Sequence, residues 1–369
     1  MLSSPVRKIL RPLVVAAVAG ALAAAVLPPP RAEAATPTYV IATVGDSWAS
    51  GEGNTPYTNS ACHRSASSYS HQVVLPDGRT VKTGVSAGTA SFDFRACSGA
   101  TTANLLTTNQ VVGSQSMVPQ LLFLNPKTTH VFVSISGNDL DFVSILSGCL
   151  VTEADCRLAI QNAKDFRLNK ALKGLTDVVK KIRSSVPQAQ IIVTGYAPLV
   201  GTSSLWGSKA TILKSFALEF NNDQRDTVKA LQRLGIDVDF VDIAPTFEGH
   251  GNADTKTSWF FAPVYYTPGG WSTSTLHPTP TGVEQIAKLV SKVVEKPYTG
   301  SCSGNVALGA TGNCVREIQN HLNAWGKSLS VDGSFGPATK AAVVSFQGAH
   351  GLTADGIVGP KTKAVLFTK

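Results

Sequence analysis

After its first 35 residues, the sequence lacks any apolar run close to the roughly 18 residues that a transmembrane helix needs. The one long run, Leu13–Leu27, lies near the N-terminus and has only fifteen residues. Basic residues precede it, and Ala32-Glu33-Ala34 follows with small residues suited to cleavage. These features predict a secretory signal peptide over residues 1–35 and an exported protein with no transmembrane segment in its mature chain.

Cys-x-x-Cys pairs and histidine pairs at zinc-finger spacing are also absent, which argues against a zinc cluster. All six cysteines follow the predicted signal peptide, as expected of cysteines that form disulfides outside the cell. Several connectivities are open to six cysteines. Proximity in the sequence favours three pairs, Cys62 with Cys97, Cys149 with Cys156, and Cys302 with Cys314. Neither a metal nor another cofactor is expected.

A strong charge of one sign is missing too. The formal net charge is +8, and the first 35 residues contain four basic and one acidic side chain, which leaves +5 for the remainder. This surplus is spread without runs, and no nucleic-acid-binding motif accompanies it, so no nucleic-acid partner is expected. It suits a soluble protein and favours contact with anionic wall polymers or lipid head groups.

The chain after the predicted signal peptide is organised around Tyr39–Gly53. Tyr39–Val44 is apolar and rich in β-branched residues, which predicts a buried strand that ends at Gly45-Asp46-Ser47. A turn of this kind leads into a helix start with free backbone N–H groups. Two interpretations of Ser47 follow. It caps the helix, or it is a nucleophile at the carboxyl end of a strand, where open α/β sheets bind their ligands.

Further short strands alternate with helices. The predicted strands are Ser91–Ala96, His130–Ser136, Gln190–Gly195 and Asp237–Ile243, and the predicted helices are Asp165–Ser185, Ala210–Leu234 and Pro280–Glu295. A long polar loop, Asn54–Asn104, and an irregular insertion at Cys149–Cys156 interrupt the pattern. The alternation predicts an α/β domain, a three-layer structure with a parallel sheet flanked by helices.

The C-terminal region contains an internal repeat. Leu329–Ala341 recurs as Leu352–Ala364 with a period of 23 residues. In each copy Asp-Gly supplies a turn and Gly-Pro starts a helix. With the helical spacing of apolar residues in Val315–Leu322, this predicts a small, mainly helical domain of about three helices. The expected boundaries are a main domain over 36–297, a linker over 298–306 and the small domain over 307–369.

Four separated residues are expected at one edge of the sheet: Ser47, Gly99, Asn138 and His277. Each follows a strand or lies in the loop before the last helix. A serine hydroxyl becomes an effective nucleophile when an imidazole takes its proton, and the oxyanion of acyl transfer needs fixed donors. Ser47 and His277 meet the first need. The backbone N–H groups of Ser47 and Gly99 and the Asn138 amide meet the second.

With these four blocks in this order, the chain resembles the SGNH hydrolases, the GDSL-type esterases and lipases. It is most similar to their secreted actinobacterial branch, which has an Ala-Cys-His-Arg-Ser segment like residues 61–65. The resemblance spans roughly residues 36–295 and implies an SGNH/flavodoxin-like fold. It implies Ser47 as nucleophile, His277 as general base and acid, and Gly99 and Asn138 as oxyanion partners. His63 and Arg64 are weaker candidates for contact with substrate.

The sequence departs from the family pattern in two places. The third block usually has Gly two residues before the Asn, where this chain has Ser136. The last block usually reads Asp-x-x-His, and here Ser274 stands in place of the acid. The backbone carbonyl of Ser274 is the expected partner of the His277 Nδ1–H, which gives a Ser-His dyad. Asp242 and Asp254 remain outside candidates for a supporting acid.

Residues 307–366 resemble the peptidoglycan-binding domain of cell-wall hydrolases, through the Val-x-x-Ile-Gln-x-x-Leu opening and the Asp-Gly-x-x-Gly-Pro-x-Thr repeat. These residues mainly form turns and core, so they indicate the fold better than the ligand. A wall polymer is the implied partner, and a spacer domain that binds nothing is the alternative.

The expected protein is therefore a secreted, monomeric serine esterase or lipase, held at the cell wall and acting on lipid or wall-linked acyl groups. The alternative is a wall-binding protein with an inactive hydrolase domain. The loop Gly249–Thr275 is rich in aromatic residues. It lines an acyl pocket or packs against the sheet, and the sequence leaves both interpretations open.

The dyad hypothesis predicts that Asp242→Asn and Asp254→Asn each leave turnover of an ester substrate nearly unchanged. If one of these carboxylates oriented His277, its loss would lower kcat by up to about 10⁴-fold, as for a triad aspartate. Steady-state kinetics of the two variants distinguishes these outcomes, and a collapse of turnover in either would contradict the dyad.

Overall fold

The computed structural model describes residues 37–186, 189–201, 206–233, 236, 238–252, 254, 256–262, 265–266, 270–271, 275–294, 302, 304–311, 313–330 and 332–368. The predicted signal peptide, part of the predicted linker and Ser274 lie outside these ranges.

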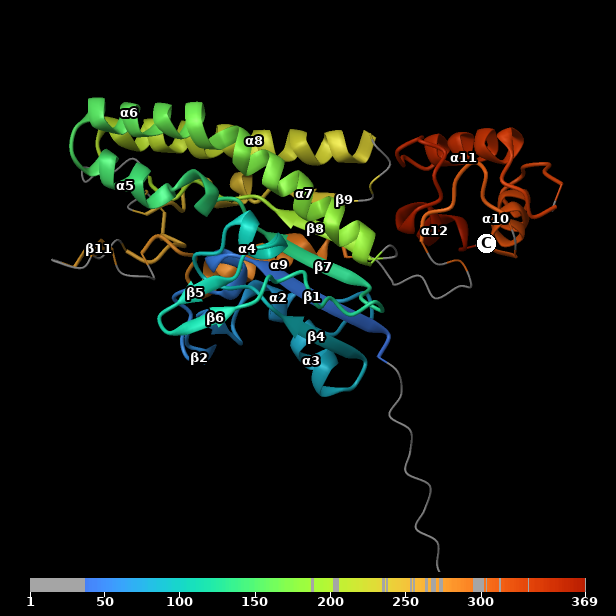
Figure 1. Ribbon diagram of the computed structural model, residues 1–369, viewed down its shortest axis with the longest axis horizontal. Coiled ribbons are helices and arrows are strands. Elements are labelled where there is room, and N and C mark those ends of the chain that lie inside the picture. The colour runs from blue at the N-terminus through green and yellow to red at the C-terminus, as the bar shows by residue number, and fades with distance from the viewer. Residues whose placement is uncertain are drawn as a thin grey trace, which may run out of the picture. The chain divides into compact units, whose positions relative to one another are not determined.

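A sheet of five parallel strands forms the centre of the main region (Figure 1). Its strand order is β4-β1-β7-β8-β9, with β4 at Ala90–Phe94, β1 at Tyr39–Gly45, β7 at His130–Ser134, β8 at Gln190–Thr194 and β9 at Val238–Val241. Every pairing in it is parallel. The five predicted strands and the α/β fold class are thus confirmed, although the predicted strand residue Asp237 lies outside the described part.

Alternate side chains of each strand enter two cores, one on each face of the sheet. Tyr39 and Ile41 pack with helices α2 (Tyr69–Gln72), α3 (Val81–Ser86) and α9 (Pro280–Ser291). Ala42 and Val44 point the other way, toward α4 (Thr102–Leu106), α7 (Asn169–Ser185) and α8 (Ser208–Arg233). Figure 1 shows these two helix layers on opposite sides of the strands. The three-layer prediction is therefore confirmed.

Two segments were wrongly predicted to be irregular. The Cys149–Cys156 insertion is a helical hairpin of α5 (Phe142–Leu150) and α6 (Glu153–Ala163), followed by a π-helical turn, η2 (Lys164–Leu168). It has its own apolar core, which includes the buried Trp206. Besides the predicted strand β4, the predicted loop Asn54–Asn104 contains α2, α3 and a small hairpin of β2 (Tyr57–Asn59) and β3 (Arg64–Ser65). Such short helices show too few turns for a clear 3.6-residue period.

The remaining elements of the main region are short. They are α1 (Ser47–Ser50), β5 (Gln110–Val112), β6 (Gln115–Met117), η1 (Asn138–Leu140), η3 (Ala244–Phe247), β10 (Tyr265–Tyr266) and β11 (Gly270–Trp271). Within the described ranges, no helix combines the length and apolarity needed to cross a membrane. Three disulfides join the pairs that proximity favours, Cys62–Cys97, Cys149–Cys156 and Cys302–Cys314.

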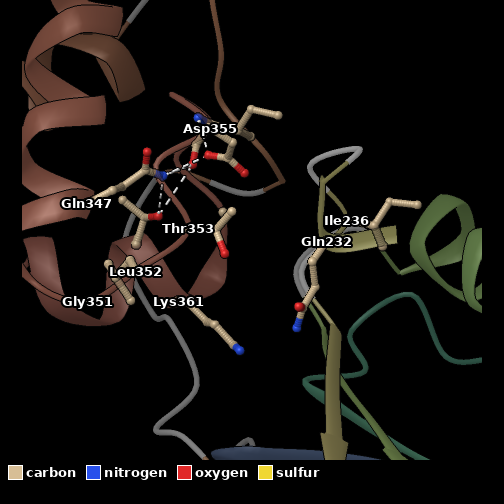
Figure 2. A pocket seen from close by; sticks show the side chains of 11 residues that line it. Gln232, Ile236, Gln347, Gly351, Leu352, Thr353, Asp355 and Lys361 are labelled. Atoms are coloured by element: carbon tan, nitrogen blue, oxygen red, sulfur yellow. Dashed lines mark hydrogen bonds between the residues drawn. The ribbon is translucent and has the colours of Figure 1, made fainter. Parts of the chain in front are cut away.

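The C-terminal region contains the three expected helices, α10 (Asn313–Ala324), α11 (Pro337–Ala349) and α12 (Pro360–Leu366). Each copy of the 23-residue repeat folds around one buried glutamine. The Gln347 amide donates to Asp355 at 2.9 Å (Figure 2), and its oxygen accepts the N–H of Gly356 at 2.9 Å. Gln319 makes the same contacts with Asp332 and Gly333. The repeat therefore encodes a turn that closes over a helix side chain.

The strand order reverses direction at β1, which lies between β4 and β7. Such a switch point leaves a crevice at the carboxyl ends of the strands, where open α/β sheets bind ligands. Three of the four residues expected to act together follow these strands. The fold thus brings the loops that contain Ser47, Gly99 and Asn138 to one edge.

Candidate active site

The turn after β1 holds Ser47 at the carboxyl edge of the sheet. β1 ends at Gly45, and Ser47 is the first residue of α1. Gly45 has a φ of +140°, and a Cβ atom on it would lie 2.1 Å from the carbonyl oxygen of Ser134 in β7. Only glycine therefore allows the end of β1 to lie so close to β7. The N–H of Asp46 donates to the same oxygen at 2.9 Å, which fixes the direction of the chain as it leaves the sheet.

Asp46, and not Ser47, caps helix α1. Its carboxylate accepts a hydrogen bond from the N–H of Trp48 at 3.0 Å and another from the hydroxyl of Tyr196. Asp46 is only 1% exposed, and this burial raises its pKa to about 7. The interpretation of Ser47 as the helix cap is therefore wrong, and its hydroxyl is directed to another partner.

That partner is His277, whose Nε2 lies 2.7 Å from Oγ of Ser47. This distance suits proton transfer from a serine nucleophile to an imidazole base. The carbonyl of His277 accepts the N–H of Phe261 at 2.9 Å. The carbonyl of the next residue, Pro278, accepts a hydrogen bond from the Asn54 side chain at 3.0 Å. Because Asn54 closely follows α1, this bond ties the segment of the serine to that of the histidine.

Gly99 and Asn138 follow the two strands that flank β1. One N–H of the Asn138 amide donates to the carbonyl of Ala100 at 2.9 Å, which leaves the second N–H for a ligand. The backbone N–H groups of Ser47 and Gly99 form no hydrogen bond with any residue that the structure describes. Donors of this kind, held at adjacent strand ends, are what a developing oxyanion requires.

Two polar contacts join the loops of the site. Asp139 accepts hydrogen bonds from both the N–H and the hydroxyl of Thr102, at 2.9 and 2.7 Å, so the loop after Asn138 is attached to the start of α4. The hydroxyl of Tyr196 accepts the N–H of Gly137 at 3.1 Å while it donates to Asp46. The loops after β1, β7 and β8 are therefore linked through Tyr196.

Two residues beside the site adopt left-handed backbone conformations that are unusual for their type. Ser136 has a φ of +91°, a region that favours glycine, which explains why the third block of the family usually has Gly at this place. Gln224 donates to the Ser136 hydroxyl at 2.9 Å and holds it there. Leu276 has a φ of +56° and is 2% exposed, so burial of its side chain anchors the backbone next to His277.

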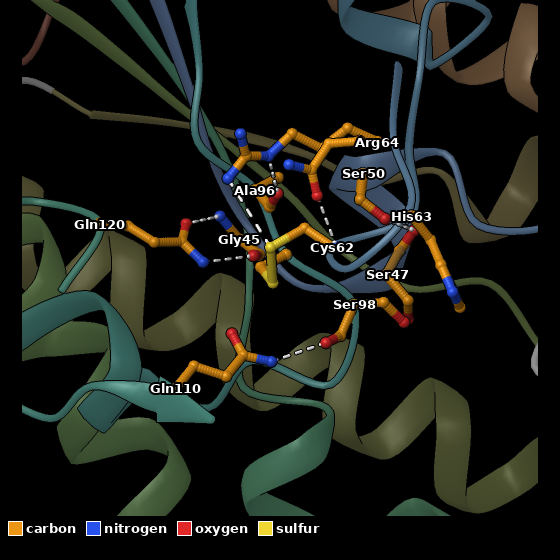
Figure 3. Close-up of a disulfide and its surroundings, with 12 residues drawn as sticks. Gly45, Ser47, Ser50, Cys62, His63, Arg64, Ala96, Ser98, Gln110 and Gln120 are labelled. Carbon is orange, nitrogen blue, oxygen red and sulfur yellow. Dashed lines mark hydrogen bonds between the residues drawn. A yellow bond between two sulfur atoms is a disulfide. The ribbon is translucent and has the colours of Figure 1, made fainter. Parts of the chain in front are cut away.

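His63 and Arg64 make contacts inside the protein around the Cys62–Cys97 disulfide (Figure 3). Nδ1 of His63 lies 2.6 Å from the buried carboxylate of Glu52. Arg64 donates from Nε to the carbonyl of Ala96 at 2.8 Å. These contacts attach the disulfide loop to the segments before and after it, and they give both side chains a structural role.

The two outside candidates for an acid have other partners. Asp242 accepts a hydrogen bond from the Asn221 amide at 2.7 Å, and Asp254 accepts the N–H of Gly251 at 3.3 Å. Ser274, the expected backbone partner of His277, lies outside the described residues. The absence of a supporting acid therefore stays a prediction.

Part of the aromatic loop packs into the core. Phe260 is 3% exposed, and its ring centroid lies 5.9 Å from that of Trp48 and 5.4 Å from that of Phe247. Trp259 stacks on His250 at 3.6 Å. For these residues the packing interpretation is the better one. The side chains of Tyr265, Tyr266 and Trp271 lie outside the description.

Sequence reasoning missed Tyr196 and Asn54. Tyr196 follows the end of β8 by two residues, so the rule that selected the other strand-end residues also points to it. Asn54 carries no such signal, because its contact with Pro278 spans 224 residues of sequence and depends on the tertiary fold.

Comparisons with known proteins identify relatives of both regions of the chain. Residues 43–285 match the model of the GDSL-like lipase/acylhydrolase family, and residues 311–366 match a domain family described as peptidoglycan-binding. Lipase 1 of Streptomyces coelicolor is 29% identical over 65% of this chain and 80% of its own length. A lipase of Streptomyces rimosus is 31% identical over 56% of this chain and 70% of its own.

A solved structure supports the fold alone. The crystal structure of phospholipase A1 from Streptomyces albidoflavus superposes with a TM-score of 0.55 at 24% identity. The match covers 69% of this chain and 99% of that one.

The buried Asp46 predicts how stability changes with pH. An unfolded aspartate has a pKa of about 3.9, so between about pH 4 and 7 only the folded state keeps this proton. The stability that Asp46 contributes is therefore fully present below about pH 4 and falls as the pH rises to about 7. Urea unfolding at several pH values gives the free energy of unfolding as a function of pH. The decrease between about pH 4 and 7 that Asp46 causes in the wild type should be absent in Asp46→Asn.

Asp226→Asn is the matched control, because the Asp226 side chain is 67% exposed. It should keep the wild-type pH dependence of unfolding. If Asp46→Asn also kept it, Asp46 would titrate as in the unfolded chain and the burial argument would be wrong.

Proposed function

The chain belongs to the GDSL-like lipase/acylhydrolase family, and we propose that it is a secreted serine hydrolase that cleaves carboxylic esters of lipids or wall-linked acyl groups through a Ser47–His277 dyad. As a member of this family it is an ester-hydrolysing enzyme that also carries a domain of the peptidoglycan-binding family.

The contact of 2.7 Å between His277 Nε2 and Ser47 Oγ is the observation that carries the proposed mechanism. Nε2 accepts the hydroxyl proton while Oγ forms a bond to the ester carbonyl carbon. The imidazolium then gives this proton to the departing alcohol oxygen, which leaves an acyl group on Ser47. Water attacks the acyl group with the same imidazole as base, and the carboxylic acid departs as Ser47 regains its proton.

The negative charge that develops on the carbonyl oxygen needs donors that are in place before the reaction. We assign this role to the backbone N–H groups of Ser47 and Gly99 and to the Asn138 amide. Support comes from the contacts that hold them, since Asn138 is fixed on Ala100 and its neighbour Asp139 on Thr102. Donors fixed in this way stabilise a transition state without reorganising during the reaction.

Lipid esters are the favoured substrates, because the two Streptomyces relatives are named lipases. The C-terminal domain gives a reason to include acyl groups on wall polymers. A series of esters with increasing acyl length would separate the two. Hydrolysis restricted to acetyl esters would favour wall glycans, and activity on long chains would favour lipids.

The nucleophile assignment predicts that Ser47→Ala lowers kcat on p-nitrophenyl esters by about 10³-fold or more, because the acyl-enzyme cannot form. Ser50→Ala is a matched control from the same helical turn. Ser50 is fully buried and donates only to a backbone carbonyl, so its loss should leave kcat nearly unchanged. An active Ser47→Ala would refute the mechanism, and an inactive wild type would favour the wall-binding protein without activity.

The anchoring role predicts that the full-length protein sediments with purified cell-wall sacculi, whereas a chain that ends at residue 297 stays in solution. Ester hydrolysis in the supernatant and pellet measures the distribution of both. Equal distribution of the two proteins would show that the C-terminal domain is a spacer, and it would leave the catalytic proposal untouched.

A further inference from the structure

We propose that Gln110 is a positioning residue that orients the backbone N–H of Gly99 for the oxyanion. This inference rests on the oxyanion role given to Gly99 in the proposed function, and it adds a residue that lies outside the four family blocks. Its basis is the hydrogen bond of 2.6 Å from Nε2 of Gln110 to the carbonyl oxygen of Ser98. Figure 3 shows this bond beside the Cys62–Cys97 disulfide.

The bond acts on Gly99 through the planar peptide group. The carbonyl of Ser98 and the N–H of Gly99 belong to the same peptide unit, and in a trans peptide they point in opposite directions. A donor that holds the carbonyl oxygen on one side therefore fixes the direction of the N–H on the other. Gln110 thus determines where the Gly99 donor points without touching the reacting atoms.

This peptide unit has few other constraints. The N–H of Ser98 donates to Cys62 at 3.1 Å, and the N–H of Ala100 donates to Cys97 at 3.0 Å, so the two flanking peptides are held. Within the described ranges, Gln110 is the one group that donates to the Ser98 carbonyl. Gly99 has a φ of +80°, and glycine allows a wide range of backbone rotation. Without Gln110, the central peptide could rotate between its fixed neighbours.

The second polar atom of Gln110 distinguishes this role from ordinary packing. Oε1 is buried and has no hydrogen-bond partner among the described residues. A buried polar atom without a partner costs on the order of 1–3 kcal/mol, so a residue kept for stability alone would be a poor choice here. The hydrogen bond from Nε2 of the same amide to the Ser98 carbonyl explains why glutamine occupies this position.

Gln120 provides an internal comparison. It is 6% exposed, and both ends of its amide are bound to Gly45, with Nε2 donating to the carbonyl at 2.9 Å and Oε1 accepting the N–H at 2.7 Å. It therefore has the fully satisfied contacts of a structural residue. Gln110, from the same 11-residue segment, satisfies only the end that holds the oxyanion loop.

The surroundings of Gln110 should accept a side chain of similar size. Gln110 is half-buried and lines a cavity of about 240 Å³ together with Arg64 and Arg95. Leucine has nearly the same size as glutamine, so it should fit beside this cavity without a clash. Gln110→Leu should therefore fold but leave the peptide unit free to turn.

The first test compares Gln110→Leu with Val111→Thr, a control in the same strand whose side chain is 72% exposed. Complete loss of an oxyanion donor costs about 10²–10³ in kcat, so a misaligned one should lower kcat by about 10- to 100-fold with KM nearly unchanged. Affinity for a boronic acid, which forms a tetrahedral adduct with Ser47, should weaken in the same proportion as kcat/KM.

The second test uses Gln110→Glu and the ratio of its kcat to that of wild type across pH. A protonated glutamic acid can donate to the Ser98 carbonyl, whereas the carboxylate cannot. The ratio should therefore rise as the pH falls, while the ratio for Gln110→Leu stays flat. Taking ratios to wild type cancels the pH dependence that the three proteins have in common.

The proposal is overturned if Gln110→Leu retains the kcat of Val111→Thr, or if kcat falls without a matching loss of boronic acid affinity. If Gln110→Leu fails to fold, the pH ratio of Gln110→Glu decides, and a flat ratio overturns it. Failure of the proposed function would show in a different result, namely a Ser47→Ala variant that still hydrolyses esters.

Discussion

The approach of Gly45 to the carbonyl oxygen of Ser134 is the contact on which the rest of the site depends. No side chain fits between these two strand ends, since a Cβ would lie 2.1 Å from that oxygen. The backbone can therefore turn at once into α1, with Asp46 as its cap and Ser47 as its first residue. Because β4 and β7 pair with β1 on either side, the loops that follow them reach the same edge. A short parallel sheet thus gathers distant segments without a long loop at its centre.

Buried hydrogen bonds then hold this edge together. Tyr196 connects Asp46 with Gly137, Asp139 connects its loop with Thr102, and Gln120 holds Gly45. Groups buried in this way gain little net stability, because each has lost its hydration. Their main effect is to fix directions, and a site that stabilises charge by position needs fixed donors. The high pKa of Asp46 is a cost of that arrangement, as its carboxylate lies away from water.

Buried hydrogen bonds also organise the C-terminal region, where they stabilise turns of the fold. Two buried glutamines, Gln319 and Gln347, each close one turn of the repeat over the helix before it. The repeated Asp-Gly and Gly-Pro residues are therefore explained by folding, and none of them needs a ligand to account for it. The repeat motif therefore identifies the fold of this region and carries no information about a ligand.

The sequence alone determined the strands, the longer helices and the order of the four blocks, because buried strands and amphipathic helices leave periodic patterns and strand ends attract small polar residues. It also selected Ser47 and His277. It did not identify the α5–α6 hairpin, whose helices are short, or decide whether Ser47 was a cap. Only the tertiary structure showed that Asp46 takes the cap while the Ser47 hydroxyl meets His277 across 230 residues of sequence. The supporting contacts of Asn54 and Gln110 were likewise beyond sequence reasoning, since neither residue belongs to a strand-end pattern and both contacts depend on the folded loops.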